Sequence, residues 1–310
     1  MLTATQIKTA QSIINIFETG DVQGDYGSVT VIARDTGHLT FGRSQTTLGS
    51  GGLYELLRLY CDNNGARFAD MLKPYLERLA AIDLSLDNDL KLHNILRATA
   101  DDPVMRDTQD YFFDENYWKP TEKTAAATGI KTALGVAVVY DGHVHGSWGL
   151  LRNKTNRTAR NIATSGEQKW IRTYVDERRK WLAENDNTAL HGTVYRMEAF
   201  QRLIDQGYWG LELPLVVCGV EISSATLSST PVKCYDGPQP GSRILSLQTP
   251  MLRGLDVRLI QLGLSCLGID IKADGIFGQT SARRIKEYQT KNRLPVTGVA
   301  DVNLISALCS

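Results

Sequence analysis

The first twenty residues have the periodicity of an amphipathic helix. Apolar side chains recur at steps of three and four residues, at Ile7, Ala10, Ile14 and Phe17. This spacing places them on one helical face. The tetrad Thr3-Ala-Thr-Gln6 has the form of a capping box at the start, and Gly20 provides a stop just beyond Glu18. We therefore expect a helix that begins near Thr3 and ends near Gly20.

Strand-like patterning follows this helix. The segment from Ser28 to Arg34 is rich in β-branched residues, Asp35-Thr-Gly-His38 has the composition of a turn, and Leu39 to Gly42 can return as a partner strand. The pattern predicts one small β-hairpin.

Helical periodicity dominates from Leu53 to about Ile204. Examples are Leu53-Leu56-Leu57-Tyr60, the segment from Asp83 to Ala98, and Trp170-Tyr174-Arg178-Trp181. Because helical patterns outnumber strand patterns so strongly, the sequence predicts a mainly α protein whose helical domain carries the hairpin near its start.

A change of composition marks the end of this domain. Residues 222–247 lose periodicity and collect Ser, Thr, Pro and Gly, which is typical of a linker or of a loosely attached extension. A compact unit follows from Pro250 to Ser310. We therefore expect a helical domain at 1–222, a linker at 223–247 and a small domain at 248–310.

Composition and charge exclude several classes of protein. The 310 residues are 42% hydrophobic and 22% charged, as in an ordinary globular protein. Lys plus Arg and Asp plus Glu both total 34, so no global field attracts nucleic acid. Apolar runs such as Leu134 to Tyr140 are too short to span a bilayer, and we expect a monomer without membrane insertion. Residues 251–310 hold 8 Lys/Arg against 5 Asp/Glu, a mild excess that suits docking on an anionic polymer.

The start of the sequence and the cysteines limit the setting further. Met1-Leu-Thr-Ala-Thr-Gln6 lacks the basic start and apolar centre of a signal peptide, so we expect synthesis in the cytoplasm and another route to any site outside it. The five cysteines are odd in number and scattered, which excludes a fully paired framework and matches no zinc spacing. We expect them to be small buried apolar residues or bystanders.

The last sixty residues contain three motifs in a recognisable order. These are Gly254-Leu-Asp-Val-Arg-Leu-Ile-Gln-Leu-Gly-Leu264, Ile271-Lys-Ala-Asp-Gly-Ile-Phe-Gly-Gln-Thr280 and Ile285-Lys-Glu-Tyr-Gln-Thr-Lys-Asn-Arg-Leu-Pro-Val-Thr-Gly298. Their order resembles the peptidoglycan-binding domain found on many cell-wall hydrolases. The resemblance implies a three-helix module that docks on wall glycopeptide, without assigning side chains to the ligand.

The residue pattern agrees with such a module. One helical face is apolar, at Val257, Ile260, Leu264 and Leu267. The turn Asp274-Gly-Ile-Phe-Gly278 allows positive φ at its glycines while Phe277 packs inward. Ile285, Tyr288 and Gln289 are expected to face back from another helix.

Two acids near the N-terminus stand in contrasting places. Glu18 ends the first helix, where the macrodipole disfavours a carboxylate, and apolar neighbours such as Phe17 should raise its pKa. Asp35 lies among turn residues, in a polar setting that should keep it ionised. Glycosidases assign an acid and a base to carboxylates in such contrasting settings. Taken singly, each residue is better explained without catalysis, Glu18 as a solvated glutamate on a frayed turn and Asp35 as a turn former.

Thr40 strengthens the hypothesis of a catalytic pair. Asp35-Thr-Gly-His-Leu-Thr40-Phe-Gly42, preceded by the helix-terminal Glu18, resembles the active-site hairpin of the lysozyme superfamily, including the family-46 glycoside hydrolases (chitosanases). The resemblance implies that Glu18 donates a proton and that Thr40 holds the attacking water beside Asp35, the base. Asp25, in Gly24-Asp-Tyr-Gly27, is an alternative base.

Two later segments resemble the same family. Val138-Val-Tyr-Asp141-Gly-His-Val-His145-Gly146 resembles its central helix, and Tyr195-Arg-Met-Glu-Ala-Phe-Gln-Arg202 with Leu213-Pro-Leu-Val-Val217 resembles its C-terminal end. The resemblance implies that Asp141 is tied to arginines behind the catalytic site, and Arg178 and Arg196 are the candidates. His143 and His145 lack a third ligand nearby, so no metal is expected.

The return strand runs into the glycine-rich stretch Arg43-Ser-Gln-Thr-Thr-Leu-Gly-Ser-Gly-Gly52, which differs from the chitosanase sequence. This difference concerns the substrate more than the reaction. The residues expected to line the sugar cleft are Tyr26, His38, Arg43, Gln45, Thr47 and His145.

The two resemblances together predict a muramidase that acts on cell-wall peptidoglycan. It would need no cofactor and would invert the anomeric centre, with carboxyl groups roughly 6.5–9.5 Å apart. The C-terminal module would raise the local enzyme concentration on the polymer. Without a signal peptide, the enzyme would serve as a phage endolysin released through a holin or as an effector injected into a rival cell.

Two alternatives to a muramidase remain open. A chitosanase is the first, although its polycationic substrate favours a strongly acidic cleft and residues 1–250 hold only 26 basic against 29 acidic residues. The second is a wall-binding protein whose helical domain has no catalytic activity.

Overall fold

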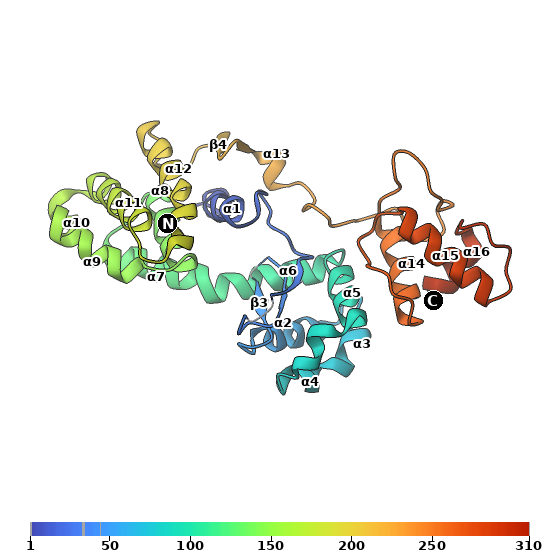
Figure 1. Cartoon of the computed structure of the whole chain (residues 1–310). Coiled ribbons are helices and arrows are strands. Elements are labelled where there is room, and N and C mark those ends of the chain that lie inside the picture. Colours follow the sequence, from blue (N-terminus) through green and yellow to red (C-terminus); the bar gives the residue numbers. More distant parts are fainter. Residues whose placement is uncertain (1, 33–34, 44, 310) are drawn as a thin grey trace. The chain divides into compact units, whose positions relative to one another are not determined.

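The computed structural model describes residues 2–32, 35–43 and 45–309. Helices form most of it, with two small antiparallel sheets (Figure 1). The mainly α class predicted from the sequence is therefore confirmed. The chain divides into two compact units, the first made of Met1–Gly24 and Phe113–Ser229, the second of Asp25–Phe112 and Thr230–Ser310.

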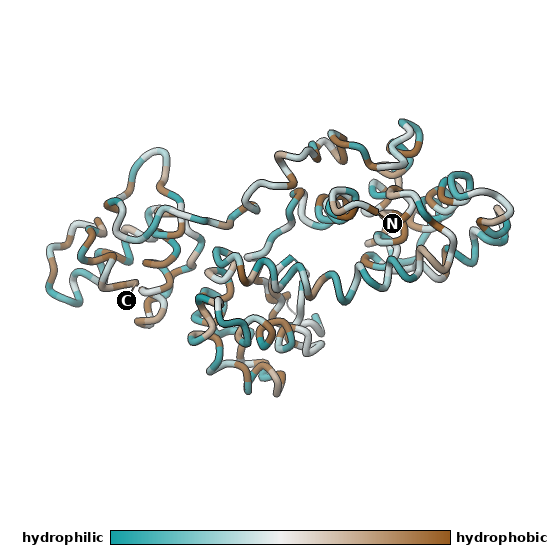
Figure 2. The backbone as a smooth tube through the Cα atoms, turned by 180° about the vertical axis from the view of Figure 1, so that it is seen from behind, coloured by the Kyte–Doolittle hydropathy of each residue, from teal (hydrophilic) through white to brown (hydrophobic). Residues whose placement is uncertain are grey.

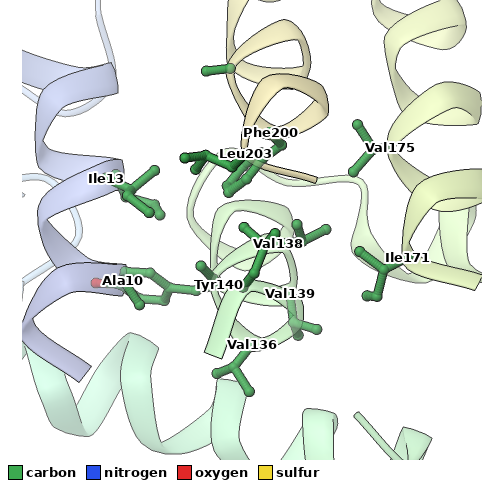
Figure 3. Close-up of a cluster of buried hydrophobic side chains, with 14 of the residues drawn as sticks. Ala10, Ile13, Val136, Val138, Val139, Tyr140, Ile171, Val175, Phe200 and Leu203 are labelled. Atoms are coloured by element: carbon green, nitrogen blue, oxygen red, sulfur yellow. The ribbon is translucent and has the colours of Figure 1, made fainter. Parts of the chain in front are cut away.

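The first unit is built around α8 (Ala133–Val144), which is apolar on every side. All residues from Ala133 to Gly142 are buried. Figure 3 shows side chains of three other helices approaching α8 from different directions: Ile13 of α1 (Ala4–Thr19), Ile171 of α11 (Glu167–Ala183) and Phe200 of α12 (Tyr195–Asp205). Because a helix that is hydrophobic all round has to be enclosed, α8 determines where its neighbours pack.

The other elements of the first unit surround this helix. They are α1 (Ala4–Thr19), a π-helical turn (Asp114–Trp118), α7 (Lys119–Thr128), α9 (Trp148–Ala159), α10 (Ile162–Ser165), α11 (Glu167–Ala183), a 3₁₀ helix (Thr188–Thr193), α12 (Tyr195–Asp205), β4 (Leu215–Val217), β5 (Val220–Ile222) and α13 (Ser224–Leu227). The β4–β5 pair was not predicted, because these segments are short and have no alternating pattern.

The helix α1 begins and ends where the sequence predicts. The Thr3 side chain accepts a hydrogen bond from the Gln6 N–H, and the capping box is complete. Gly20 adopts a left-handed conformation, φ 80°, and its N–H donates to the Ile16 carbonyl. The predicted apolar face is confirmed, since Phe17 and its predecessors Ala10 and Ile14 are buried.

The second unit combines the hairpin, a group of short helices and the C-terminal module. Its elements are β1 (Val29–Val31), β2 (Leu39–Phe41), β3 (Thr46–Thr47), α2 (Gly52–Cys61), α3 (Ala69–Leu72), 3₁₀ helices (Lys73–Tyr75 and Leu84–Asn88), α4 (Leu76–Ala80), α5 (Leu90–Thr99), most of α6 (Pro103–Phe113), α14 (Leu255–Cys266), α15 (Gln279–Lys291) and α16 (Val302–Cys309). Figure 2 shows hydrophobic and hydrophilic residues interspersed along the helices of the chain.

The predicted hairpin is present and has a third strand. β1 and β2 are antiparallel with Thr30 opposite Thr40, and β3 adds Thr47 on the other side of Thr40. Of the strand expected over Ser28–Arg34, only Val29–Val31 is a strand, and residues 33 and 34 lie outside the described residues. The sequence did not reveal β3 because its glycine-rich surroundings carry no alternating apolar pattern.

The helix expected over Asp83–Ala98 is divided in two. A 3₁₀ helix occupies Leu84–Asn88, and α5 begins at Leu90, where the Asp89 side chain caps it by accepting the Leu92 N–H at 2.9 Å. The break follows from Asp83 and Asp89, whose side chains bond to the backbone and start two separate helices.

The C-terminal module has the three predicted helices, α14, α15 and α16. Phe277 and Ile285 are fully buried, as expected. The prediction for Leu267 is wrong, because this side chain is 55% exposed. α14 ends at Cys266, so Leu267 lies at the helix cap and leaves the buried face.

The module packs on α5 within the second unit. Asn94 is buried, and its Nδ2 donates to Ser265 Oγ at 2.9 Å and to the Ile271 carbonyl at 2.7 Å. Its Oδ1 accepts the Ala273 N–H at 2.9 Å. Leu262 of α14 joins the apolar core that α2 and α5 form. A buried polar side chain thus joins two segments far apart in the chain.

Residues 230–247 belong to the second unit and contact its other segments. The Tyr235 N–H donates to Asp101 Oδ1 at 2.7 Å, Asp236 pairs with Arg106 at 3.0 Å, and Leu245 forms a bridge with Ala300. The predicted boundaries 1–222, 223–247 and 248–310 stay a prediction, because grouping by contacts divides the chain differently.

Two properties of the described residues complete the fold. None of their helices combines the length and apolar character needed to cross a membrane. All five cysteines are free, with Cys61 and Cys234 buried but Cys218 and Cys266 exposed.

Replacement of Asn94 by leucine should destabilise the second unit. The change strands the Ala273 N–H and the Ile271 carbonyl in a buried place, so we expect a loss of about 3 kcal/mol in unfolding free energy. Urea denaturation of the full chain measures it. The matched control is Ser265→Ala, which removes one bond and should cost about 1 kcal/mol. Equal stability of Asn94→Leu and the unmodified chain would contradict the role of this residue.

Candidate active site

Glu18 lies in the last turn of α1 and binds an arginine. Its Oε1 accepts a hydrogen bond from Arg196 Nη1 at 2.8 Å, and its side chain is 45% exposed. The last turn of α1 has no basic residue, so Arg196 of α12 supplies the positive charge that a helix C-terminus favours. The apolar setting expected for Glu18 is therefore only partly present: Phe17 is buried beside it, but the carboxylate faces a guanidinium.

Asp141 is buried on α8 between two buried arginines. Its Oδ2 accepts from Arg178 Nη1 at 2.5 Å, and its Oδ1 accepts from Arg196 Nε at 2.8 Å and Nη2 at 2.5 Å. Burial alone would raise the pKa of Asp141, but the two adjacent guanidiniums outweigh burial and hold this pKa below its usual range. Asp141 is thus an ionised partner that Arg178 and Arg196 share.

His145 ends this chain of contacts. Arg178 Nη2 lies 3.1 Å from His145 Nδ1. Burial, together with the charge of Arg196, lowers the pKa of His145, so the ring is neutral at pH 7 and Nδ1 can accept the hydrogen bond. We call Glu18, Arg196, Asp141, Arg178 and His145 the Asp141 cluster. Among the described residues no group of His, Cys, Asp and Glu is arranged to hold a metal ion.

Asp35, the second predicted carboxylate, belongs to the other unit. It is exposed in the turn that joins β1 to β2. Its backbone N–H donates to the Ile32 carbonyl at 3.1 Å, and its own carbonyl accepts the His38 N–H at 3.4 Å. Asp35 forms no ion pair with another described residue, so its carboxylate lies in the wet, polar setting that the sequence predicts.

Thr40 lies on β2, one strand position from the turn, with its side chain buried. Its Oγ1 donates to the His38 carbonyl at 3.0 Å. Because the hydroxyl proton is committed, Oγ1 can act toward a water only as an acceptor. The turn itself is held by Asp87, which lies 2.8 Å from His38 Nδ1 and accepts the Leu39 N–H at 2.7 Å.

Tyr26 and Arg43, which we expected in the cleft, are held by α6. Tyr26 is 4% exposed, and its hydroxyl donates to Asp110 at 2.6 Å. Burial raises the pKa of Tyr26, so it stays protonated. The Arg43 guanidinium pairs with the same Asp110, and its backbone N–H donates to Gln109 Oε1 at 3.0 Å. Asp110 thus fixes the end of the hairpin.

Sequence reasoning missed Asp87, Asp110 and Gln109. Each is an ordinary polar residue on a helix, and no local motif marks it. Its role depends on a partner 49 to 84 residues away, and one sequence without homologues contains no signal for such pairs.

The remaining candidates are distributed around the hairpin. Gln45 is exposed and donates to the Gly42 carbonyl at 2.9 Å, while Thr47 donates to Ser50 Oγ at 2.8 Å. Asp25, the alternative base, accepts the Gly27 N–H at 3.1 Å and pairs with Lys233 at 2.7 Å. This ion pair favours Asp35 over Asp25 as a base.

The fold and these residues define a glycoside hydrolase with an added binding module. Residues 12–215 match glycosyl hydrolase family 46, and residues 253–308 match the putative peptidoglycan binding domain. The chain therefore belongs to glycosyl hydrolase family 46 and carries a C-terminal peptidoglycan-binding domain. Both resemblances predicted from the motifs are confirmed.

Similar proteins are known in sequence and structure. A chitosanase from Bacillus subtilis (strain 168) is 28% identical over 233 residues, which cover 70% of this chain and 83% of that protein. A Gynuella sunshinyii family-46 chitosanase in complex with chitotetraose is 26% identical with a TM-score of 0.56, covering 73% of this chain and 99% of that one. A mutant Bacillus subtilis MY002 chitosanase complexed with six GlcN is 26% identical with a TM-score of 0.57. The match covers 70% of this chain and 95% of that one.

The catalytic roles assigned from the sequence stay predictions. Glu18 belongs to the first unit, whereas Asp35 and Thr40 belong to the second. The expected separation of the carboxyl groups, roughly 6.5–9.5 Å, is likewise untested. The contacts of Asp141 with Arg178 and Arg196 agree with the support that the family resemblance implies.

Removing the Asp141 carboxylate should destabilise the protein strongly. Asp141→Ala leaves the buried Arg178 without an ion pair and leaves Arg196 with Glu18 as its remaining carboxylate partner, which costs about 3–5 kcal/mol. Glu18→Gln, which alters a half-exposed partner of Arg196, should cost less than about 1 kcal/mol. Urea denaturation at pH 7 compares the two. Similar losses in both variants would show that Asp141 is not the centre of the cluster.

The Asp141 carboxylate also predicts that the free energy of unfolding decreases at acid pH. Because the pKa of Asp141 is lower in the folded than in the unfolded state, its contribution is complete above about pH 4 and is lost as pH falls through the folded-state value. In Asp141→Asn this part of the pH dependence should be missing. Unfolding free energies measured from pH 2 to 7 test this; parallel curves for the two proteins would contradict it.

Proposed function

We propose that this glycoside hydrolase is a muramidase that cleaves the β-1,4-linked glycan of the bacterial cell wall. The observation that carries the proposal is the union of a family-46 domain and a peptidoglycan-binding domain in one chain. A module that holds the polymer raises the concentration of glycan near the catalytic residues without new chemistry. A phage endolysin or an injected antibacterial effector would use such an activity.

The module offers a surface that suits a glycan. A groove of about 620 Å³ is lined by Tyr288, Leu294 and Pro295 together with the polar side chains Thr297, Asp301 and Asn303. Aromatic and apolar side chains can pack against the face of a sugar ring, while the polar ones meet its hydroxyl groups. This combination supports glycan binding by the module.

We assign the protonation step to Glu18. Its hydrogen bond to Arg196 uses Oε1, which leaves Oε2 to carry the proton toward the glycosidic oxygen. Arg196 is fixed in turn by the buried Asp141. The carboxyl group is therefore oriented by a charge that is itself immobile, which is what positioned acid catalysis needs.

We assign the activation of water to Asp35 and Thr40. The Thr40 hydroxyl donates to the His38 carbonyl, so it can accept a hydrogen bond from the water. Asp35 would take the other proton as the water attacks the anomeric carbon opposite the leaving group. This arrangement inverts the anomeric centre.

Hydrolysis of chitosan is the second candidate. The relatives named above are chitosanases, and two of them were solved with glucosamine oligomers or chitotetraose. The peptidoglycan-binding domain favours the wall glycan instead. The two substrates differ in charge, since chitosan carries ammonium groups and peptidoglycan carries carboxylates.

Glu18→Gln should abolish hydrolysis and preserve binding. We expect the unmodified chain to release dye from labelled sacculi faster than it releases reducing sugar from soluble chitosan. The variant should lose activity by a factor on the order of 100 or more and still sediment with sacculi. The control is Glu184→Gln, an exposed glutamate at the end of α11. Release from chitosan alone would overturn the wall substrate, and lysis by the variant would overturn the role of Glu18.

The two candidate bases can be separated. Asp35→Asn should reduce the rate by a factor on the order of 100 or more, because the attacking water loses its proton acceptor. Asp25→Asn removes the ion pair with Lys233 and should change the rate by less than about threefold. Initial rates on the better substrate measure both. The reverse order would make Asp25 the base.

A further inference from the structure

A pocket of about 250 Å³ lies in the second unit, between the start of β1 and the C-terminal module. One side is formed by Asp25 and residues 27–30, another by Arg97 of α5, and the rest by Lys233, Arg258 and residues 272–274. We call it the junction pocket. It contains none of the residues to which the reaction is assigned, and it lies outside the groove that Tyr288 lines.

The walls of the junction pocket carry more positive than negative charge. Four cationic side chains line it, against the two carboxylates of Asp25 and Asp274. Lys233 pairs with Asp25 at 2.7 Å, and Arg258 pairs with Asp101 at 3.3 Å. Among the described residues, Arg97 and Lys272 form no ion pair. The excess positive charge therefore resides on these two side chains.

Of these two side chains, Arg97 has the greater need of an anionic partner. Its guanidinium is half-buried and donates one hydrogen bond, from Nη1 to Asn94 Oδ1 at 3.1 Å. A guanidinium has five N–H donors. Burial, and then repulsion by Arg258, lowers the pKa of Arg97. A positive charge that is partly desolvated beside a like charge is favoured only if an anion comes close.

Asp274 does not provide Arg97 with this anionic partner. Its Oδ1 accepts from Gln261 Nε2 at 3.0 Å and from the Ile276 N–H at 2.9 Å, which ties it to the turn of the module. It attracts Arg97 from a distance but forms no ion pair with it. The junction pocket thus has a fixed wall, a partly buried guanidinium and an exposed ammonium.

We propose that the junction pocket binds a carboxylate of the peptide stem on cell-wall glycan, through Arg97 and Lys272. The inference rests on the proposed wall substrate. Arg97 can bind a carboxylate through two parallel N–H groups, whereas Lys272 adds a point charge. The same pocket repels the ammonium groups of chitosan, so it selects between the two candidate substrates by charge.

The junction pocket lies beside the hairpin, so binding there can position the substrate. Its wall includes Ser28, Val29 and Thr30, and Thr30 is paired with Thr40 of the neighbouring strand. A stem peptide bound by Arg97 and Lys272 would therefore lie beside the strand that pairs with the proposed water-positioning threonine. The module therefore does more than tether the enzyme, because it completes a subsite beside the hairpin.

Calorimetric titration of the full chain with muramyl dipeptide tests the proposal. This probe has a free carboxylate and a single sugar, so a glycosidase cannot cleave it between sugars. Arg97→Gln should weaken binding about tenfold and Lys272→Gln about threefold. Lys272 is exposed, and its side chain forms no hydrogen bond or ion pair with another described residue, so its replacement by glutamine breaks no side-chain contact of the folded chain. Lys91→Gln, an exposed lysine on α5, is the control and should bind normally.

The ligand arms identify the anion. The amidated dipeptide should bind at least about tenfold more weakly than the free acid. Equal binding of the two, or unchanged binding in both Arg97→Gln and Lys272→Gln, would overturn the proposal. Tighter binding of glycerol phosphate than of muramyl dipeptide would also overturn it, in favour of a phosphate-bearing wall polymer.

The failure of this inference differs from the failure of the proposed function. If sacculi are hydrolysed but neither variant changes dipeptide binding, the wall substrate stands and the junction pocket fails. If the dipeptide binds as predicted but only chitosan is hydrolysed, the pocket stands and the proposed function fails.

Discussion

A carboxylate shared by two buried guanidiniums is the interaction on which the first unit depends. Asp141 is the one charged side chain in the buried part of α8, and Arg178 and Arg196 reach it from α11 and α12. Because an unpaired charge there would cost several kcal/mol, the three helices have one favourable arrangement. Arg196 extends this order to Glu18, so the proposed acid is positioned from the core outward.

Buried polar side chains also hold the second unit together. Asn94 satisfies backbone groups of the module, and Arg258 donates to the Arg97 carbonyl at 2.5 Å and to the Lys233 carbonyl at 2.7 Å. Buried hydrogen bonds of this kind are costly to break one at a time. The C-terminal module is thus built onto α5, in the same unit as the hairpin that carries Asp35 and Thr40. A flexible tether would only concentrate the enzyme on its polymer, whereas this arrangement also gives the two parts a common pocket.

The candidate site residues that could be predicted from the sequence are those that lie in short local motifs. Glu18, Asp35 and Thr40 lie in short motifs, and the family assignment that they suggested is confirmed. Their supports were not predictable in the same way: Asp87 and Asp110 hold the hairpin from helices that follow much later in the chain. Tyr26 and Arg43 were assigned to the cleft, but the structure shows their polar groups committed to Asp110. A single sequence gives the type of a side chain and leaves its partner open.

The sequence by itself determined the elements whose causes lie within a few residues. The Thr3 cap, the Gly20 stop, the turn at Asp35 and the inward Phe277 follow from spacing, capping and backbone preference. Only the tertiary structure decided that Leu267 leaves the core, that β3 joins the hairpin, and that residues far apart meet around Asp141 and Arg97. Caps and turns depend on residues that are neighbours in the sequence. The partners of a buried charge, by contrast, are the residues that the fold brings within hydrogen-bonding distance, wherever they lie in the chain.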